Sequence, residues 1–399
     1  MKYTPYLLTL LLFWSCSTFE EDLKLPSSQV PFSELETNLP VINIVTDERD
    51  LERMLGQPTE EIEMDGLFNL YRNQQLIIAN EKVELEVKGN FSVTFSLKSL
   101  GIKFDKKYDN SDRSLINPSY VLAHHNIDKI KAIRLRNSGN DFKKTMIKDL
   151  SFTQLAINAN LDLDLTYGEP AIVYVNEAFY GLLNLRTEAN TNGMAGLYDV
   201  KKREVTLTKL IPEELIKKDG DFDRIDRLVE AIEQNNIDYL RSEIDLNNFI
   251  DYMVFESFIG NTDWPDKNVR FHAINDGKFR FILSDLDEAA WLKMDKSPLE
   301  IIYNKGSNFL SNLFEVFYEE ESFQQEFWGR YNSLLQNRDI SFDKLESIVQ
   351  TNSSQIRSEM PLQIDKYDTP GSMIEWDIEL DKMLVLFYER EEVVRRFVE

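Results

Sequence analysis

Residues 260–269 read Gly-Asn-Thr-Asp-Trp-Pro-Asp-Lys-Asn-Val, which places Asp263 five positions before Asn268. The preceding run, residues 246–259, is strongly apolar and predicts a buried helix, for which Gly260 is a natural C-terminal residue. Asn, Asp and Pro favour loops, so the polar residues after this helix are expected to form one. The spacing predicts a catalytic loop. A helix cap and a turn are the alternative.

A strand-like run over residues 278–284 follows this loop and ends in two acids, Asp285 and Asp287. Phosphoryl transfer uses one carboxylate near the acceptor hydroxyl, and an amide oxygen with another carboxylate for Mg²⁺. An Asp-x-x-x-x-Asn segment followed by a strand ending in Asp is the order of a kinase-type site. Alternation places both acids on one side of the strand, where a cation or a raised pKa would relieve their repulsion. A metal site is therefore predicted, with a solvated strand end as the alternative.

The composition limits the possible classes of protein. The 399 residues are 42% hydrophobic and 12% aromatic, which is enough for a large core. The net charge of −24 argues against a broad nucleic-acid surface, so no nucleic-acid partner is expected. One cysteine and three histidines exclude an internal disulfide and give no pattern for a zinc cluster.

The first residues predict export and a lipid anchor. Residues 1–16 combine a basic start, a short apolar run and Cys16, as in a bacterial lipoprotein signal peptide in which this cysteine is lipidated. The acidic residues 20–22 resemble the export signal of surface lipoproteins, and residues 17–38 read as a flexible tether. We therefore expect a protein held at the outer membrane or cell surface by its lipid alone. An ordinary cleaved signal peptide is the alternative.

Periodicity predicts an α+β protein. The expected strands cover residues 40–46, 83–89, 93–104, 130–135, 171–174 and 180–185, and the expected helices cover residues 141–158, 222–235, 246–259, 308–335, 341–358 and 373–396. Asp141 is the expected N-cap of the first helix. This order predicts a strand-rich lobe over residues 39–188, a helical lobe core with the catalytic and metal segments over 189–300, and a helical C-terminal part over 301–399.

Five runs together carry a resemblance to a known family. They are Lys88-Gly-Asn-Phe-Ser-Val-Thr-Phe-Ser-Leu-Lys-Ser99, Arg136-Asn-Ser-Gly-Asn-Asp141, Tyr174-Val-Asn-Glu-Ala-Phe-Tyr-Gly-Leu182, Asn261-Thr-Asp-Trp-Pro-Asp-Lys-Asn268 and Ser284-Asp-Leu-Asp287. Over residues 40–396 the sequence resembles the CotH kinase family, in its bacterial lipoprotein subgroup. The resemblance implies an atypical protein-kinase-like fold with two lobes and a helical C-terminal extension.

The resemblance also implies roles and cofactors, namely ATP with Mg²⁺ or Mn²⁺. Asp263 would orient or deprotonate the acceptor hydroxyl. Asn268 and Asp285 would hold the metal that bridges the phosphates, and Asp287 is a weaker second metal candidate. Lys98 would contact phosphate.

Further residues are assigned to the nucleotide. From the order along the chain, we expect Asp149 on the first long helix to pair with Lys98, as a strand lysine pairs with a helix glutamate in ordinary kinases. Arg186 to Glu188 would form the hinge whose backbone meets adenine. Lys88 opens the segment that reads Arg-Gly-Asn in the family.

The sequence departs from the family at the phosphate-binding segment. Lys88 replaces the first arginine, Val93 the second, and Leu97 the first of two lysines. Loss of an arginine fork removes bidentate phosphate binding. Two structural alternatives stay open: Lys98 as a surface lysine, and an ion pair between Arg136 and Asp141 at the helix start.

Three functions are compatible with these patterns. The first is a kinase that phosphorylates serine or threonine of a secreted or surface protein. The second is a pseudokinase that serves as a surface scaffold, which the replacements at Val93 and Leu97 favour. The third is a carbohydrate-associated surface protein, for which abundant carboxylates are the sole support.

Overall fold

The computed structural model describes residues 32–104, 115–116, 122, 129–212 and 214–398. The predicted signal peptide with Cys16 lies outside the described residues, as does the predicted tether up to residue 31. Within the described residues, no helix has both the length and the apolar character needed to cross a bilayer.

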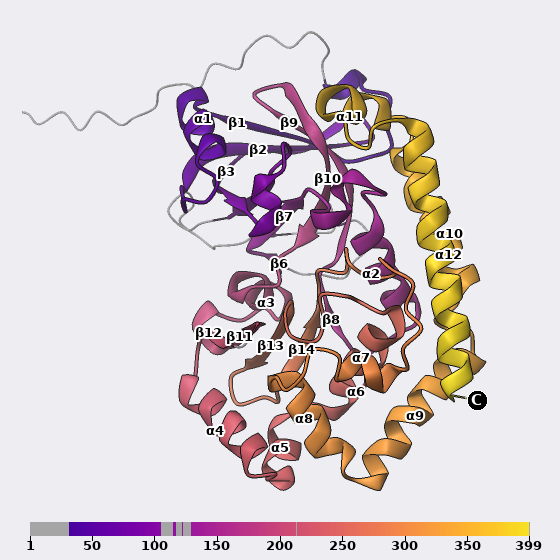
Figure 1. The fold of residues 1–399 in the computed structure, drawn as a ribbon. Helices are drawn as coiled ribbons and strands as arrows, with labels where there is room; N and C mark the ends of the chain where they lie inside the picture. The colour runs from indigo at the N-terminus through magenta and orange to yellow at the C-terminus, as the bar shows by residue number, and fades with distance from the viewer. Residues whose placement is uncertain (1–31, 105–114, 117–121, 123–128, 213, 399) are drawn as a thin grey trace, which may run out of the picture.

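A closed barrel of seven strands forms the first lobe, at the top of Figure 1. In order around the barrel, the strands are β1 (Val41–Thr46), β2 (Met64–Arg72), β3 (Gln75–Lys88), β4 (Ser99–Lys103), β7 (Ala132–Arg136), β10 (Ala178–Thr187) and β9 (Gly168–Val175). β1 and β9 pair in parallel and close the barrel, and the other neighbours are antiparallel. The barrel is accompanied by helix α1 (Glu48–Gly56) and the short pair β5 (Leu115–Ile116) and β6 (Lys129–Ile130).

The second lobe contains a five-stranded sheet and most of the helices. The sheet runs β12 (Glu214–Asp219), β11 (Val205–Ile211), β13 (Val269–Ile274), β14 (Arg280–Leu283) and β8 (Asp164–Leu165). The helices are α3 (Thr191–Leu197), α4 (Phe222–Glu233), α5 (Ile237–Glu243), α6 (Leu246–Ile259), α7 (Pro298–Ile302), α8 (Phe309–Tyr318) and α9 (Glu321–Gln336).

Helix α6 packs against one face of this sheet. Phe249 and Tyr252 of α6 contact Phe281 of β14, with ring centroids 5.2 Å apart in both pairs. The opposite face carries Leu207 and Ile282, which pack with Met194 of α3. Because α6 and β14 are fixed to one another, the loops that follow them emerge at neighbouring points.

Three C-terminal helices connect the two lobes: α10 (Phe342–Ile356), α11 (Met360–Tyr367) and α12 (Met373–Val398). In Figure 1, α10 and α12 run beside each other along the height of the molecule. The Trp376 indole donates to the carbonyl of Thr145 at 2.9 Å, and Arg390 donates to the carbonyl of Phe258 at 2.8 Å. The same helix is therefore bonded to both lobes.

These elements confirm the predicted fold class, a strand-rich region followed by a mostly helical part. The predicted helix at residues 246–259 and the strand pair around residues 176–177 are also confirmed. The second lobe contains more sheet than the sequence predicts: β14 matches the strand expected over residues 278–284, and β8, β11, β12 and β13 are additional.

The predicted strand over residues 93–104 is wrong in its first half. Residues 91–94 form a short 3-10 turn, and β4 begins only at Ser99. Val93 and Leu97 are turned into the core, and Lys98 donates from Nζ to the carbonyls of Val93 and Phe95. These contacts close the segment into a loop.

The predicted helix over residues 141–158 begins later than expected. Helix α2 covers Lys148–Asn158, because Met146 has φ +63° and interrupts the helical course. The Asp141 carboxylate accepts from the backbone of Thr145 and Lys148, each at 3.0 Å, so it holds the turn that leads into α2.

The predicted helix over residues 308–335 is two helices, α8 and α9, with extended backbone at Glu320. The break allows Phe314 of α8 to meet Phe323 and Phe327 of α9, at centroid distances of 5.7 and 5.1 Å. Aromatic packing across the break stabilises the corner.

Candidate active site

A cavity of about 580 Å³ lies between the barrel and the second sheet. Its walls come from β3, β7 and β10 of the barrel, β11 and β13 of the sheet, and the loops after α6 and β14. The predicted site residues that line it are Asp263, Asn268, Asp285, Asp287, Asp149, Lys88, Arg186 and Glu188. Segments distant in sequence therefore meet at one cavity.

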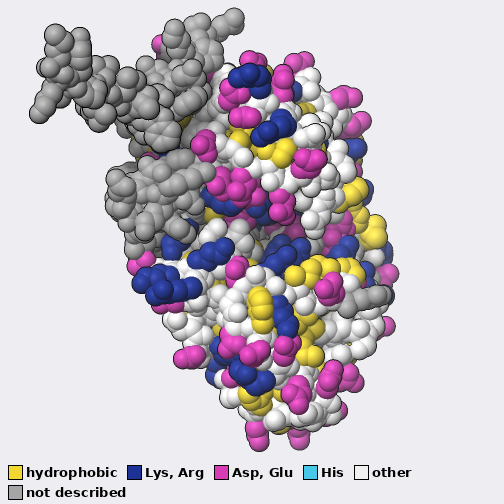
Figure 2. All heavy atoms as spheres, turned by 90° about the vertical axis from the view of Figure 1, so that its left-hand side faces the viewer, with side chains coloured by type: hydrophobic (Ala, Val, Ile, Leu, Met, Phe, Trp, Pro, Cys, Tyr) yellow, Lys and Arg dark blue, Asp and Glu magenta, His cyan; other side chains and the backbone are white. Residues whose placement is uncertain are grey.

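The cavity concentrates positive charge in a protein of net charge −24. Eight cations line it: Lys88, Arg134, Arg136, Arg186, Lys209, Lys218, Lys267 and Arg270. Six acids line it: Asp149, Glu188, Asp219, Asp263, Asp285 and Asp287. Figure 2 shows Lys and Arg side chains gathered across the middle of one face, although the chain as a whole is acidic. Such a local excess attracts an anionic ligand.

The loop after α6 is anchored by buried groups. Gly260 ends the helix in the left-handed region at φ +62°. Asn261 donates to the Glu256 carboxyl at 2.9 Å, and Trp264 is buried against Tyr252. Burial, opposed in part by Asn261, raises the pKa of Glu256 to about 8. At neutral pH the Glu256 carboxyl is therefore mostly uncharged, and it supports the loop through its hydrogen bond with Asn261.

Asp263 and Asn268 lie together in this loop. The Asn268 side-chain amide donates to Oδ2 of Asp263 at 3.3 Å, and Lys267 forms an ion pair with Oδ1. Asn268 has φ +62°, a conformation that Asn tolerates better than most residues. Both carboxylate oxygens of Asp263 are therefore oriented by neighbours that also line the cavity.

Arg136 joins the two acids that follow β14. Its Nη2 forms an ion pair with Asp285 and lies 3.4 Å from Oδ2 of Asp287. Burial opposes ionisation of Asp285, but the charges of Arg136 and Arg270 outweigh it and hold the pKa of Asp285 below its ordinary value. The cation expected to relieve the repulsion between these acids is thus an arginine.

Asp287 is held by the turn that follows β7. Asn140 donates its backbone N–H to Oδ2 of Asp287 at 2.5 Å. Gly139 has φ +57°, and a Cβ there would lie 2.0 Å from the same oxygen. Burial, assisted by Asp285, raises the pKa of Asp287 well above its ordinary value. These contacts make Asp287 a poorer metal candidate than Asp285.

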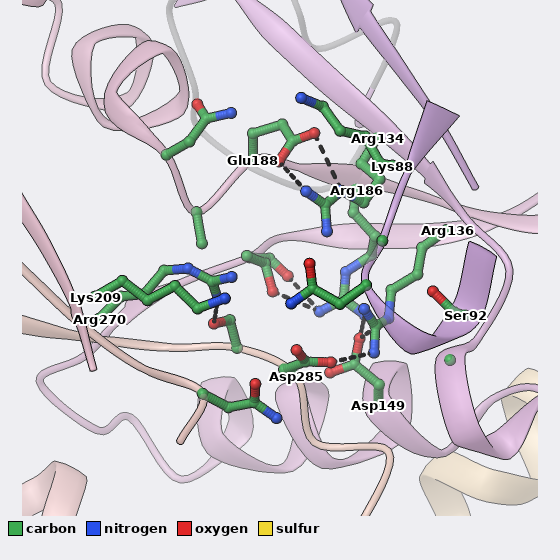
Figure 3. A pocket seen from close by; sticks show the side chains of 18 of the residues that line it. Lys88, Ser92, Arg134, Arg136, Asp149, Arg186, Glu188, Lys209, Arg270 and Asp285 are labelled. Atoms are coloured by element: carbon green, nitrogen blue, oxygen red, sulfur yellow. Dashed lines mark hydrogen bonds and ion pairs between the residues drawn. The ribbon is translucent and has the colours of Figure 1, made fainter. Parts of the chain in front are cut away.

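Asp149 of α2 connects three segments. Its Oδ2 lies 3.3 Å from Nε of Arg136 and 3.0 Å from Nη1 of Arg186, and its Oδ1 accepts from the backbone of Leu286 at 2.9 Å. Figure 3 shows these side chains converging beside Asp285. The predicted pair between Lys98 and Asp149 is therefore wrong, and so is the alternative pair between Arg136 and Asp141.

Lys98 does not line the cavity, because its ammonium group is bonded inside its own loop. A phosphate contact from Lys98 thus finds no support in its position. Lys88 does line the cavity, where its Nζ lies 2.6 Å from Glu86.

The predicted hinge residues use their side chains within the protein. Arg186 donates to Thr153 and Thr166 at 2.7–2.9 Å. Glu188 accepts two bonds from Arg134, at 3.1 and 2.9 Å. The backbone of Arg186 and Thr187 is paired within the barrel, and the Thr187 N–H donates to the carbonyl of Tyr167 at 2.9 Å. Of the three, Glu188 alone follows the end of β10, so its backbone is the best placed for the role that the resemblance implies.

The residues present fit a Mg²⁺ ion with few protein ligands. Within the described ranges, no cluster of three or more His, Cys, Asp or Glu suits a metal. Oδ2 of Asp285 and the side-chain oxygen of Asn268 accept no bond from any described residue. Mg²⁺ commonly uses one or two protein oxygens together with water and phosphate. Asn268 and Asp285 match that requirement.

Sequence reasoning missed the cations of the second sheet, Lys209 and Arg270. Arg270 stands two positions after Asn268, and Lys209 stands two positions after Leu207 in the run Val-Thr-Leu-Thr-Lys. Alternation along these strands was the signal that places both on one face.

The family model described as CotH kinase protein matches residues 85–394, which is most of the chain. The matched range contains every residue discussed at the cavity. No curated protein matches the sequence.

Proposed function

The chain belongs to the CotH kinase family, and we propose that it transfers the γ-phosphate of ATP to serine or threonine hydroxyls of a secreted or surface protein. One observation carries the proposal: Asp263, Asn268 and Asp285, from two separate loops, line one cavity rich in cations. Kinase-type transfer requires this combination of an orienting carboxylate and oxygen ligands for a metal.

In the proposed step, the acceptor oxygen bonds to the γ-phosphorus while the bond from phosphorus to the β–γ bridging oxygen breaks. The acceptor proton passes to Asp263, and ADP leaves with the electron pair of the broken bond. Lys267 and Asn268 hold the two oxygens of Asp263, so its orientation is set before an acceptor binds.

Asn268 and Asp285 would hold the metal, whose charge neutralises the phosphate oxygens during transfer. Arg136 holds Oδ1 of Asp285, and Oδ2 accepts no hydrogen bond from any described residue. Within residues 186–188, the backbone of Glu188 would meet adenine, because its side chain is bonded to Arg134 and it follows the paired end of β10.

The proposal is tested with radiolabelled ATP, Mg²⁺ or Mn²⁺, and a panel of secreted proteins as acceptors. We expect labelled phosphoserine or phosphothreonine from the unaltered chain, and a loss of at least about 100-fold in Asp263→Asn and Asp285→Asn. Asp276→Asn, an exposed acid in the turn between β13 and β14, is the matched control. Equal labelling in all four proteins would refute the assignment.

A catalytically impaired scaffold is the second candidate, and the phosphate-binding segment favours it. Val93 and Leu97 are core residues here, and Lys98 is bonded within its loop. Thermal unfolding with millimolar ATP and Mg²⁺ separates the candidates, because a ligand that binds only the folded state raises the midpoint. An unchanged midpoint would favour the scaffold.

We further propose that Cys16 is lipidated and anchors the protein at the outer membrane or cell surface, facing its protein substrate. The support is the sequence of residues 1–22. Metabolic labelling with a palmitate analogue should mark the unaltered chain and not Cys16→Ser. Recovery of the unaltered chain in the soluble fraction would count against the anchor.

A further inference from the structure

Two cations lie side by side on the wall of the cavity that the second sheet forms. Lys209 of β11 and Arg270 of β13 are register partners in the second sheet, and both line the cavity. Figure 3 shows their side chains side by side, extended toward the centre of the cavity and toward Asp285. The sheet thus presents two positive charges from adjacent strands at one point.

These two cations lack the carboxylate partners that other cations of the cavity have. Among the described residues, the side chain of Lys209 makes no hydrogen bond or ion pair, and the side chain of Arg270 makes one hydrogen bond, to the Ser284 hydroxyl at 3.1 Å. By contrast, Arg134 is bonded to Glu188, and Arg186 to Asp149. The difference separates cations that support the fold from cations that are free for a ligand.

The repulsion between the adjacent charges of Lys209 and Arg270 destabilises the folded state. Like charges directly opposite one another on a sheet are destabilising. Burial, followed by the charge of Arg270, lowers the pKa of Lys209 to about 8. An anion between the two side chains would remove both penalties. The charge of Asp285 offsets part of this cost, because it opposes the lowering of both pKa values. Asp285 forms no ion pair with either side chain among the described residues, so the arrangement points to a bound anion.

We infer that Lys209 and Arg270 form an oxyanion site that binds a phosphate group of the nucleotide. An arginine fork and a lysine point charge suit phosphate oxygens. The site would supply the positive charge that is absent where Val93 and Leu97 stand, and it supplies it from the opposite lobe. This inference rests on the proposed kinase function for the identity of the ligand.

Calorimetric titration of the full chain with ATP, AMP, adenosine and inorganic tripolyphosphate tests the site. In Lys209→Met and Arg270→Met, we expect affinity for ATP and for tripolyphosphate to fall about 10- to 100-fold, which corresponds to loss of a charged hydrogen bond. Adenosine binding should not change. Lys202→Met, an exposed charge just before β11, is the matched control and should bind as the unaltered chain does.

Arg270→Lys guards against a simple folding defect, since it keeps the charge and removes the fork. We expect it to retain tripolyphosphate binding at reduced affinity. If the Met variants do not fold, the affinity of Arg270→Lys decides the question. Tripolyphosphate binding equal to that of the unaltered chain would overturn the inference.

A proton measurement gives a second readout. A phosphate beside Lys209 favours its charged form, so binding at pH 8 should take up protons from the buffer. The charged groups that act on Lys209 are Arg270, Asp285, Lys218 and Arg134. Titrations in two buffers of different ionisation enthalpy should show proton uptake that Lys209→Met loses.

The outcomes separate this inference from the proposed function. Nucleotide binding that is unaffected in Lys209→Met and Arg270→Met would overturn the oxyanion site and leave the kinase proposal standing. Binding of tripolyphosphate without ATP would support the oxyanion site and count against the kinase. Binding of neither would overturn both.

Discussion

The charged side chains in two regions of the cavity differ in whether they form ion pairs. At the carboxylate cluster, which comprises Asp149, Asp285 and Asp287, two guanidinium groups are shared among three acids. At the oxyanion site, Lys209 and Arg270 lie side by side, and neither forms an ion pair with an acid of the described residues, although the charge of Asp285 acts on both. Paired buried charges hold segments in place, whereas unpaired charges at a cavity are available to a ligand. The comparison suggests that the first region is needed to fold and the second to bind.

Removing Asp149 should have the largest effect. Asp149→Ala leaves Arg136 and Arg186 without their shared carboxylate, and the loss of one partner of a buried pair costs about 3–5 kcal/mol in the free energy of unfolding. Urea denaturation measures it. Asp226→Ala removes an exposed partner of Lys217 and should cost less than about 1 kcal/mol. Similar losses in both variants would contradict the distinction between the regions.

Removing Arg136 should come next and should change the response to metal. Arg136→Met takes the cation away from Asp285 and Asp287, so we expect a loss of about 3 kcal/mol. Mg²⁺ should restore part of this loss, because a divalent ion can replace the guanidinium. Thermal unfolding with and without Mg²⁺ gives the measurement, with Arg357→Met, at an exposed pair, as control. No added benefit from Mg²⁺ would argue against metal binding at Asp285.

Glu256 should produce a smaller, pH-dependent effect. Its folded pKa, about 8, is raised above that of the unfolded chain, so the folded state binds the extra proton between the two values. Stability should therefore fall as pH rises through that window, by at most about 1.4 kcal/mol per pH unit. Glu256→Gln should flatten the curve of unfolding free energy between pH 6 and pH 8. A curve unchanged by the substitution would show that Glu256 ionises normally.

The smallest effect is expected at Lys267, whose ion pair with Asp263 is partly exposed. Lys267→Met should alter the free energy of unfolding by less than about 1 kcal/mol. The pair orients Asp263, so phosphate transfer should fall although stability does not. Denaturation and transfer assays on the same preparation check both, and a large stability loss would place Lys267 with the structural charges.

Much of the fold could be predicted because local patterns were strong. The apolar run before Gly260 predicts a helix and the runs at residues 171–174 and 180–185 predict strands, and all three agree with the structure. A strand is expected from residue 93 because Val93, Phe95 and Leu97 alternate as in a strand, but β4 begins only at Ser99. A turn that buries Val93 and Leu97 satisfies the same pattern.

The charge partners were harder to predict than the elements. The order along the chain predicts that Lys98 pairs with Asp149, but the order of strands in the barrel determines which cation reaches Asp149. Strand β7 carries Arg134 and Arg136 on one face, and it lies between β4 and β10. Arg136 therefore reaches Asp149, while Lys98, just before β4, turns back on its own loop. Strand neighbours of this kind are not evident from one sequence.

The C-terminal helices have a consequence for how ligands enter and leave. Gln363 of α11 accepts from the backbone of Leu182 in the barrel, while Arg390 of α12 binds Ser257 and Phe258 at the end of α6. A wide hinge motion between the lobes would break these bonds. We therefore expect ligands to exchange through rearrangement of side chains at the mouth of the cavity. Removing α12 would allow the lobes to move apart, so ligand release should be faster even if affinity were kept.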